Sequence, residues 1–256
     1  MEQIDAVADM ILQSEKVVIF TGAGFSTESG VPDFRSPGGV WDKFDPSELN
    51  YQNFLRSEEI REKYWRMHQM MWETIREAQP NNGHHAVTDL YNMGKLDCVV
   101  TQNTDGLHQK AGVPDELVIE LHGTMQWVNC LDCGQRYPRA QVYDKIVAGD
   151  NVPHCDGCKG LLKPATIAFG QMMPQEETRE AEHRSASCDL FLAAGSSLLV
   201  YPAAQMPVIA KNSGARLVIF NLTPTPHDHH ADIVISEKTG ETLSRVVSQV
   251  KAKMKK

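Results

Sequence analysis

Residues 16 to 36 read KVVIFTGAGFSTESGVPDFRS, a strand-like run that leads into a glycine turn. The apolar, β-branched residues from Val17 to Phe20 are long enough for one buried strand. Gly22-Ala23-Gly24 follows, and Ser26 to Ser29 are residue types that commonly start a helix. Glycines at such a turn let the backbone approach an anion, and a helix N-terminus favours phosphate oxygens. Thr27 replaces the third glycine of the dinucleotide-binding pattern, so an ordinary tight turn remains an alternative.

The next residues, Gly30-Val31-Pro32-Asp33-Phe34-Arg35, place an acid, an aromatic ring and an arginine beside a proline in an expected loop. That mixture suits a site for a charged, partly aromatic ligand. Taken together, GAGFSTESGVPDFRS closely resembles the opening signature of the sirtuins, the NAD-dependent protein lysine deacylases.

Length and composition are those of a globular enzyme. The 256 residues are enough for one large domain with a smaller insertion, and 41% hydrophobic and 23% charged residues are ordinary for this class. No apolar run is long enough to cross a bilayer, and the acidic N-terminal segment MEQIDAVADM lacks the basic region of a signal peptide. We therefore expect a cytoplasmic protein. The net charge of −8 argues against nucleic-acid binding and is compatible with basic, lysine-bearing partners.

Short apolar runs recur along the chain, and each ends in glycine, amide or ionisable residues. They lie at 17–20, 97–100, 117–121, 189–194, 216–220 and 233–235, and they alternate with helix-like stretches such as 3–13 and about 54–78. Strands that alternate with helices predict a doubly wound, Rossmann-like parallel sheet covered on both faces. Because ligands bind beyond the carboxyl ends of such strands, we expect these polar strand ends to meet in one crevice.

Two Cys-x-x-Cys pairs, Cys130/Cys133 and Cys155/Cys158, are separated by about twenty residues. This spacing is typical of four thiolates around a tetrahedral zinc ion, which leaves no position for water and indicates a structural metal. A redox-active dithiol is the main alternative. Cys98 and Cys188 lie in or beside strand-like runs, where small core residues are expected.

Several other patterns have a structural explanation. His84 and His85 are adjacent, so on a helix they would face different directions rather than share a metal. The cluster His227-Asp228-His229-His230 could bind metal, although a solvated loop is favoured. Tyr64, Met67, Met71 and Ile75 form a stripe at helical spacing that predicts a core contact, and it is also compatible with a groove for an apolar ligand.

Later motifs also match the sirtuin pattern, so the resemblance covers essentially the whole chain in order. They are TQNTDGLH at 101–108, His122-Gly123, both cysteine pairs, Gly195-Ser196-Ser197-Leu198, Val200-Tyr201-Pro202, Asn221 and Lys238-Thr239. The resemblance implies a single catalytic domain over 1–256. Its parts would be an NAD-binding lobe (about 1–36, 81–125 and 165–256), a helical insert (about 37–80) and a zinc ribbon (about 126–164). An acyl-lysine peptide would lie in the cleft between them.

The resemblance implies a role for each matching residue. His122 would be the general base, which removes a proton from a ribose hydroxyl after the acyl oxygen attacks C1′ and nicotinamide leaves. The products would be free lysine, nicotinamide and O-acyl-ADP-ribose. Histidine suits this role because its ordinary pKa of about 6.5 leaves it largely neutral near pH 7. The implied NAD contacts are Gly22, Ala23, Gly24, Thr27, Val31, Asp33, Phe34, Arg35, Gln102, Asn103, Asp105, Gly195, Ser196, Ser197, Asn221 and Thr239. The implied peptide contacts are Phe169, Gly170 and Val200.

Some positions depart from the family pattern. Many sirtuins have Ile or Val where this chain has Thr104, and Thr where it has Ser196. The segment 163–171, KPATIAFGQ, lacks a common Arg, Val-Val and Glu, so the preferred substrate sequence stays open. An NAD-dependent hydride-transfer dehydrogenase would usually keep the third glycine and an acid after the second strand. An NAD-dependent ADP-ribosyltransferase or a zinc-bearing NAD sensor is the other alternative.

The helical insert bears on the acyl group. Sirtuins that favour dicarboxylic acyl groups carry a Tyr-x-x-Arg pair, whereas Tyr64 is followed here by Met67 at the arginine position. With Met70, Met71 and Trp72 nearby, the pocket is expected to be apolar and to favour acetyl and other short neutral acyl groups over succinyl or malonyl. Arg66 or Arg61 could still supply the missing charge.

Overall fold

The computed structural model describes residues 2–255. Its larger sheet has six parallel strands in the order β3-β2-β1-β7-β8-β9. They are β1 (Val17–Thr21), β2 (Leu96–Thr101), β3 (Val118–Glu120), β7 (Leu190–Ala194), β8 (Arg216–Phe220) and β9 (Ile233–Ile235). Each apolar run identified in the sequence contributes one of these strands, which confirms the predicted doubly wound sheet. The strand order reverses between β1 and β7, which places the ligand crevice of such folds beside the Gly22 turn.

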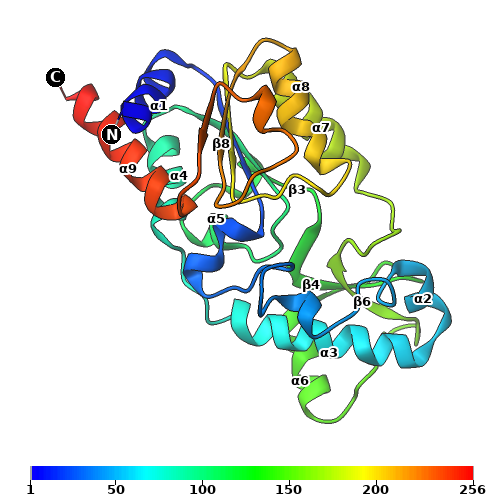
Figure 1. Cartoon of the computed structure of the whole chain (residues 1–256). Helices are drawn as coiled ribbons and strands as arrows, with labels where there is room; N and C mark the ends of the chain where they lie inside the picture. The colour runs from blue at the N-terminus through cyan, green and yellow to red at the C-terminus, as the bar shows by residue number, and fades with distance from the viewer. Residues whose placement is uncertain (1, 256) are drawn as a thin grey trace.

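Helices cover both faces of this sheet (Figure 1). One face packs against α1 (Glu2–Gln13), α4 (Asn82–Asn92) and α9 (Thr239–Met254), and the other against α7 (Gln175–Ser187) and α8 (Met206–Asn212). In β1 the side chains alternate between the two cores, with Val17 and Ile19 on the α1 side and Val18 and Phe20 on the α8 side. Burial on both faces explains why the strand reads as a continuous apolar run. A short helix, α5 (Leu107–Lys110), follows β2.

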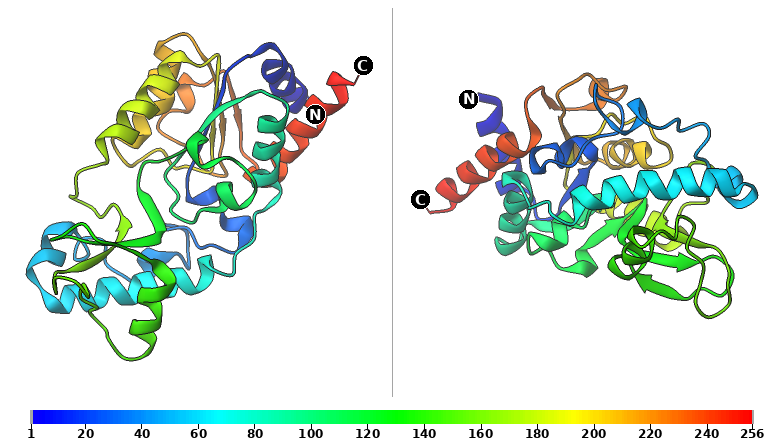
Figure 2. Two further views of the ribbon diagram at one scale, coloured as in Figure 1. Left: turned by 180° about the vertical axis from the view of Figure 1, so that it is seen from behind. Right: turned by 90° about the horizontal axis from the view of Figure 1, so that it is seen from below.

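A smaller antiparallel sheet stands beside the carboxyl end of the large one. Its order is β5-β4-β6, with β4 (Gly123–Cys130), β5 (Arg136–Pro138) and β6 (Leu162–Thr166). The helices α2 (Tyr51–Arg56), α3 (Glu58–Ile75) and α6 (Arg139–Val147) accompany it, and α3 runs alongside β4 and β6 in all views (Figures 1 and 2). The stripe predicted on α3 does pack into an apolar core, where Met71 and Ile75 join Met125.

The structure differs from the sequence-based expectation at two places. The helix expected over about 54–78 is divided at Ser57, whose hydroxyl accepts a hydrogen bond from the Ile60 N–H at 3.3 Å and so caps α3. After the Gly22 turn there are two 3₁₀ turns, Ala23–Phe25 and Thr27–Ser29, instead of an α-helix. Gly30, with φ of 83°, ends the second turn in a left-handed conformation. Within residues 2–255, every helix is too short or too polar to span a membrane.

Candidate active site in the cleft between the two sheets

A cleft of about 1020 Å³ lies beyond the carboxyl ends of β1, β2, β3, β7 and β8, with α3 and the segment after β6 on its other side. Every residue that the sirtuin resemblance assigned to NAD or peptide contacts lines it, together with His122. The structure therefore brings the predicted site residues together. Their individual roles remain predictions.

The glycine turn is fitted closely against the loop after β7. The Gly24 N–H donates to the Gly195 carbonyl oxygen at 2.9 Å, and a Cβ atom at Gly22 would lie 2.8 Å from that same oxygen. Gly195 itself has φ of 66°, and a Cβ there would overlap the backbone of Phe25. This approach needs glycine on both loops, which explains the Gly-x-Gly pattern without a third glycine.

Asn103 and Asp105, which follow β2, are tied to the glycine turn. The Asn103 amide donates to the Gly22 carbonyl oxygen at 3.0 Å and to Ser26 Oγ at 3.2 Å. Ser26 Oγ in turn donates to Asp105 Oδ2 at 2.7 Å, and the Leu107 N–H donates to Asp105 Oδ1 at 2.9 Å. Burial raises the pKa of Asp105, while these hydrogen bonds oppose the rise. Sequence reasoning treated Ser26 only as a helix-starting residue and missed that it links the two loops.

Gln102 and Ser196 form a second link across the cleft floor. Gln102 Nε2 donates to Ser196 Oγ at 2.7 Å, and the Leu198 N–H also donates to that oxygen at 3.2 Å. Both side chains line the cleft, so the hydroxyl at the less common Ser196 position is held in place by the loop itself.

His122 lies between the two sheets, two residues after the end of β3 and directly before β4. Its backbone carbonyl accepts a hydrogen bond from Ile167 N–H at 2.8 Å, which anchors it to the segment after β6. Gly123 has φ of 70°, and a Cβ there would overlap the Ala165 carbonyl oxygen, so glycine is required beside the histidine. Burial lowers the pKa of His122, and a hydrogen bond to the backbone of Gln102 partly offsets this. The imidazole is therefore neutral at pH 7 and able to accept a proton.

The far end of the cleft is formed by the start of α9 and the loop after β8. Thr239 is buried at the first turn of α9, and Asn221 Nδ2 donates to the Thr223 carbonyl oxygen at 2.7 Å. Glu28, which sequence reasoning did not single out, accepts hydrogen bonds from the N–H groups of Gly240 at 2.7 Å and Glu241 at 3.2 Å. Its carboxylate thus satisfies the N-terminus of α9 and joins it to the glycine turn. At the opposite rim, Phe169 is 45% exposed, as a peptide contact would require.

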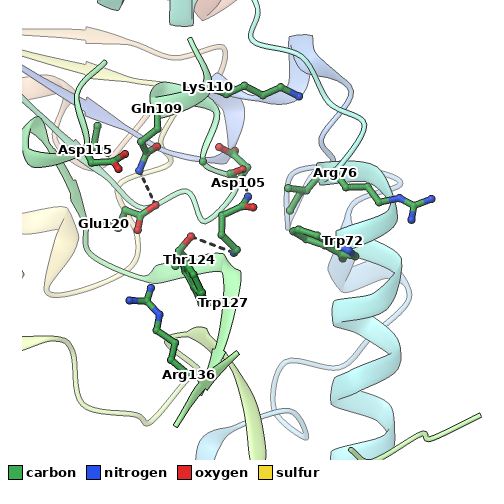
Figure 3. A pocket seen from close by; sticks show the side chains of 14 residues that line it. Trp72, Arg76, Asp105, Gln109, Lys110, Asp115, Glu120, Thr124, Trp127 and Arg136 are labelled. Carbon is green, nitrogen blue, oxygen red and sulfur yellow. Dashed lines mark hydrogen bonds between the residues drawn. The ribbon is translucent and has the colours of Figure 1, made fainter. Parts of the chain in front are cut away.

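The residues of α3 that face the cleft differ from the apolar residues predicted to form the acyl pocket. Tyr64, His68, Met71 and Ile75 line the cleft, whereas Met67 and Met70 do not. Trp72 instead faces a second cavity of about 630 Å³ (Figure 3), which shares Asp105 and Ile75 with the cleft. In that cavity burial, together with the charges of Asp105 and Asp115, raises the pKa of Glu120 to about 7.

Neither arginine considered for the acyl pocket lines the cleft. Arg66 is exposed, and Arg61 Nη1 donates to the carbonyl oxygens of Phe54 at 3.0 Å and Leu55 at 3.3 Å. Two other cations, Arg139 and Lys163, are buried in the smaller sheet and its helix, which the sequence did not reveal. Arg139 lies over the rings of Trp65 and Trp72, with its guanidinium carbon 5.1 Å and 5.9 Å from the two ring centres.

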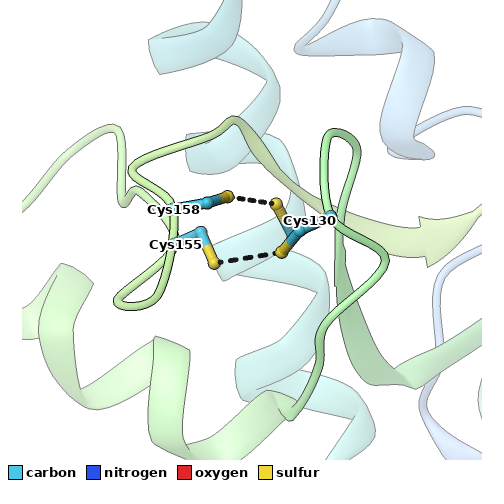
Figure 4. Close-up of side chains that lie close together, drawn as sticks. Cys130, Cys155 and Cys158 are labelled. Atoms are coloured by element: carbon cyan, nitrogen blue, oxygen red, sulfur yellow. Dashed lines mark hydrogen bonds between the residues drawn. The ribbon is translucent and has the colours of Figure 1, made fainter.

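The four cysteines form a compact cluster away from the cleft (Figure 4). Their sulfur atoms all lie within 4.8 Å of one another, with Cys130 and Cys158 at 3.5 Å and Cys133 and Cys155 at 3.7 Å. Zinc bound by four sulfurs at about 2.3 Å requires sulfur separations of about 3.8 Å, so the cluster fits a tetrahedral zinc. Tyr137 Oη lies 3.1 Å from Cys155 Sγ. Cys98 and Cys188 are buried free thiols, as expected.

The histidines at 84–85 and 227–230 were the other candidates for a metal site. His84 is buried in the first turn of α4, where it forms a capping box with Asn81, and His85 is exposed. The rings of His229 and His230 lie 3.9 Å apart. Within residues 2–255, however, the four cysteines are the one group whose ligand atoms gather closely enough for a metal ion.

Comparisons with known proteins agree with this geometry. The model of the Sir2 family matches residues 22–202. The chain is 48% identical over 244 residues to an NAD-dependent protein deacetylase 1 of Bradyrhizobium diazoefficiens, covering 95% of each chain. It is 42% identical over 250 residues to an NAD-dependent protein deacylase 2 of Pyrobaculum aerophilum, covering 97% of this chain and 96% of the relative.

Solved structures of Sir2 proteins superpose along almost the full length. One Sir2 enzyme has a TM-score of 0.89 and 40% identity, covering 98% of this chain and 99% of the other. A Sir2 protein bound to a propionylated peptide has a TM-score of 0.87 and 34% identity, covering 96% and 98%. Since the family model matches more than half of the chain and relatives match nearly all of it, this protein belongs to the Sir2 family.

Proposed function

We propose that this protein removes acetyl and other short neutral acyl groups from lysine side chains of proteins and uses NAD as the co-substrate. The observation that carries the proposal is the position of His122. It lies at a strand end in the same cleft as the glycine turn, the Asn103–Asp105 loop and the exposed Phe169 rim. The products would be free lysine, nicotinamide and O-acyl-ADP-ribose.

Different groups of cleft residues would contact different parts of NAD. The glycine turn, with Ala23, Thr27, Phe34 and Arg35, would hold the diphosphate and cover the nicotinamide ribose. Asn103, Asp105 and Val31 would surround the nicotinamide, and Gln102 would contact its ribose. Ser196, Ser197, Asn221 and Thr239 would hold the adenosine half. The support for this division is that all of these residues line one continuous cleft.

His122 would act as the general base. Its lowered pKa keeps the imidazole neutral, so it can take a proton from a ribose hydroxyl once the acyl oxygen has attacked C1′ and nicotinamide has left. The acyl-lysine would enter past Phe169, Gly170 and Val200, and its acyl group would end against the cleft face of α3. Cys130, Cys133, Cys155 and Cys158 would hold a structural zinc that fixes the smaller sheet.

The proposal extends to organisation and location. The NAD-binding lobe would comprise about 1–36, 81–125 and 165–256, with a helical insert over about 37–80 and a zinc ribbon over about 126–164. Basic, lysine-bearing proteins in the cytoplasm are the proposed substrates of a chain with net charge −8.

One incubation tests the activity. The purified protein is mixed with NAD and an acetyl-lysine peptide library, and nicotinamide release and peptide mass are followed together. Loss of 42 mass units (about that of an acetyl group) with stoichiometric nicotinamide supports deacylation. Nicotinamide release with a peptide that gains ADP-ribose would indicate an ADP-ribosyltransferase, and reduction to NADH would indicate a dehydrogenase.

A further inference from the structure

The motif TQNTDGLH at 101–108 ends in a histidine to which the proposed chemistry gives no role. Residues 102 to 105 of this motif line the cleft, but His108 lies outside it, on α5. Its side chain is buried, with 1% of its surface exposed. Burying an imidazole costs free energy unless its polar atoms are hydrogen-bonded, so the contacts of His108 should show what it does.

The imidazole of His108 contacts two hydroxyl groups at the ends of the central strands. His108 Nε2 lies 3.0 Å from Thr21 Oγ1, and this hydroxyl donates to Thr101 Oγ1 at 2.8 Å. Thr21 and Thr101 are the last residues of β1 and β2 and are paired in the sheet. The Asn103 N–H donates to Thr101 Oγ1 at 3.0 Å. The threonine pair, Thr21 and Thr101, therefore connects His108 to the backbone of Asn103.

The donors and acceptors at the threonine pair define which ring nitrogen of His108 carries the hydrogen. Thr21 Oγ1 uses its own hydrogen on Thr101, so it accepts from His108 and Nε2 carries the hydrogen. Nδ1 is then a lone pair, and it is closed off from solvent without a hydrogen-bond partner in the described part of the chain. Burial lowers the pKa of His108 to about 3. The ring is therefore a neutral hydrogen-bond donor at pH 7.

His108 is fixed in place by the glycine turn. Its ring stacks on Phe25, which lies in the first 3₁₀ turn after Gly22, with the ring centres 5.3 Å apart and the planes at 27°. His108 and the threonine pair do not line the cleft, so they can act on a ligand only through residues that do. Asn103 is the cleft residue to which they are hydrogen-bonded.

We propose that His108 is a positioning residue of the nicotinamide pocket, which acts through the hydroxyl groups of Thr21 and Thr101 on the backbone of Asn103. The inference rests on the proposed deacylase function, in which Asn103 contacts the nicotinamide. The Asn103 side chain is bound to the Gly22 carbonyl oxygen, and the threonine pair holds its backbone. Without these bonds the loop after β2 should shift, which weakens nicotinamide binding and slows its departure.

The experiment removes one hydroxyl group and measures two ligands separately. Thr21→Val keeps the shape of this fully buried side chain but lacks the hydroxyl, whereas Thr21→Ser restores it. The readouts are inhibition by added nicotinamide, the released product, and the KM of an acetyl-lysine peptide. Thr21→Val should raise the nicotinamide inhibition constant about tenfold, the value of one neutral hydrogen bond, and leave the peptide KM within about twofold. Thr21→Ser should return the inhibition constant towards the wild-type value.

Two further variants locate the effect. His108→Phe keeps a ring against Phe25 but has no N–H, and it should raise the inhibition constant as Thr21→Val does. Thr242→Val is the matched control, because Thr242 is a buried threonine on α9 whose hydroxyl donates to Glu237 Oε2 at 3.3 Å. Its nicotinamide inhibition should stay unchanged. Wild-type inhibition in an active Thr21→Val enzyme would overturn the inference, even if urea unfolding shows a loss of stability, because a purely structural hydroxyl gives that result.

One measurement needs no variant. In the wild-type protein the Asn103 amide should exchange with solvent as slowly as the amides of β2, because its acceptor is a buried hydroxyl. Rapid exchange at Asn103 would overturn the inference whether or not the variants fold. If the wild type releases no nicotinamide from NAD and acetyl-lysine peptide, the proposed function itself fails. Release with unchanged inhibition in Thr21→Val overturns only the role of His108.

Discussion

His122 combines two properties that a general base needs, a neutral ring and a fixed position. Burial keeps its pKa below the ordinary value, and the hydrogen bond from Ile167 N–H holds its backbone. Gly123 lets the chain turn from the large sheet into the small one directly beside it. The surroundings of His122 at this strand end therefore set both the protonation state of its ring and the position of its backbone.

Replacing His122 by Ala should reduce deacylation kcat/KM by about 10² to 10⁴, the usual contribution of a positioned general base. NAD binding, followed by calorimetry, should change little because the glycine turn and the Asn103–Asp105 loop remain. His85→Ala is the control. Near wild-type turnover in the His122 variant would show that another group removes the proton.

The pH profile follows from the direction of the same pKa shift. As the proposed general base, His122 would act in its deprotonated form, so activity should be lost only as the pH falls through a pKa that burial has moved below 6.5. We expect kcat/KM for acetyl-lysine peptide to be flat from pH 8 to about 6.5 and to decline in more acidic buffer. A decline centred above pH 6.5 would contradict the assignment.

Acetyl-lysine should be preferred over succinyl-lysine by tens-fold or more in kcat/KM. The cleft face of α3 carries no accessible cation, since Arg61 is bound to backbone carbonyls and Arg66 is exposed elsewhere. Desolvating a carboxylate without a partner costs several kcal/mol, and each 1.4 kcal/mol or so is tenfold in specificity. Equal kcat/KM for matched acetyl and succinyl peptides would show that a cation does reach the pocket.

The helices and strands around the cleft are held in place by contacts at the ends of these elements. The small sheet has only three strands, and its turns converge on the four cysteines. On the other side of the cleft, α9 begins at Thr239, where Glu28 satisfies its first N–H groups. The small sheet on one side of the cleft therefore carries the candidate zinc site, and a helix cap holds the other side.

Removing zinc should unfold the small sheet and abolish deacylation. Structural zinc contributes about 10–16 kcal/mol in small zinc peptides at neutral pH, more than so small a sheet gains from burial. Metal analysis should find one zinc per chain, and Cys130→Ala or a strong chelator should remove it along with activity. Cys188→Ala, which changes a thiol outside the cluster, is the control. Fully active protein without zinc would contradict this role.

Glu28→Gln should weaken the start of α9 by about 1 kcal/mol, because a charged acceptor at a helix N-terminus is replaced by a neutral one. The effect should appear in urea unfolding and as faster amide exchange at Gly240 and Glu241. Glu177→Gln, an exposed change in the first turn of α7, provides the comparison. Unchanged exchange at both amides would show that Glu28 does not hold this helix.

At the scale of the whole molecule, buried ionisable groups connect elements that are distant in sequence. His84 on α4 and His108 on α5 have ring centres 4.9 Å apart, and both pack against Phe25 in the glycine turn. His108 Nε2 lies 3.0 Å from Thr21 Oγ1 at the end of β1. These histidines tie the site to the centre of the large sheet.

The folded protein should lose stability in acid because of this pair. Burial lowers the pKa of His84 to about 2 and of His108 to about 3, whereas both titrate near 6.5 when unfolded. The unfolded chain therefore binds more protons below pH 6.5, and stability falls as the pH decreases from 6.5 towards 3. The slope for two histidines is about 2.7 kcal/mol per pH unit. Urea unfolding between pH 7 and 5 measures it. His84→Asn should lower the slope by about 1.4 kcal/mol per pH unit, the share of one histidine, and an unchanged slope would exclude this residue as a cause.

Local sequence was sufficient for much of the fold. The strand at 17–20 reads as apolar because both of its faces are buried, and all six such runs belong to the sheet. The cysteine spacing likewise predicts the four-cysteine cluster, because two Cys-x-x-Cys pairs can place four thiolates around one ion. His122 could be found because a strand end in a parallel sheet points towards the ligand crevice.

Only the tertiary structure decided which distant segments contact each other and which side of a helix faces the cleft. Glu28 and α9 are separated by more than two hundred residues, and no local pattern shows that one caps the other. The sequence placed Met67 and Trp72 in the acyl pocket. Each residue of a helix is turned by about 100° from the one before it, so a small rotation of α3 changes which side chains face the cleft. The packing of α3 on β4 puts His68 there instead. Arg139 and Lys163 look like ordinary surface residues in the sequence. They are buried because the small sheet, α3 and α6 close around them, and burial is a property of the assembled fold.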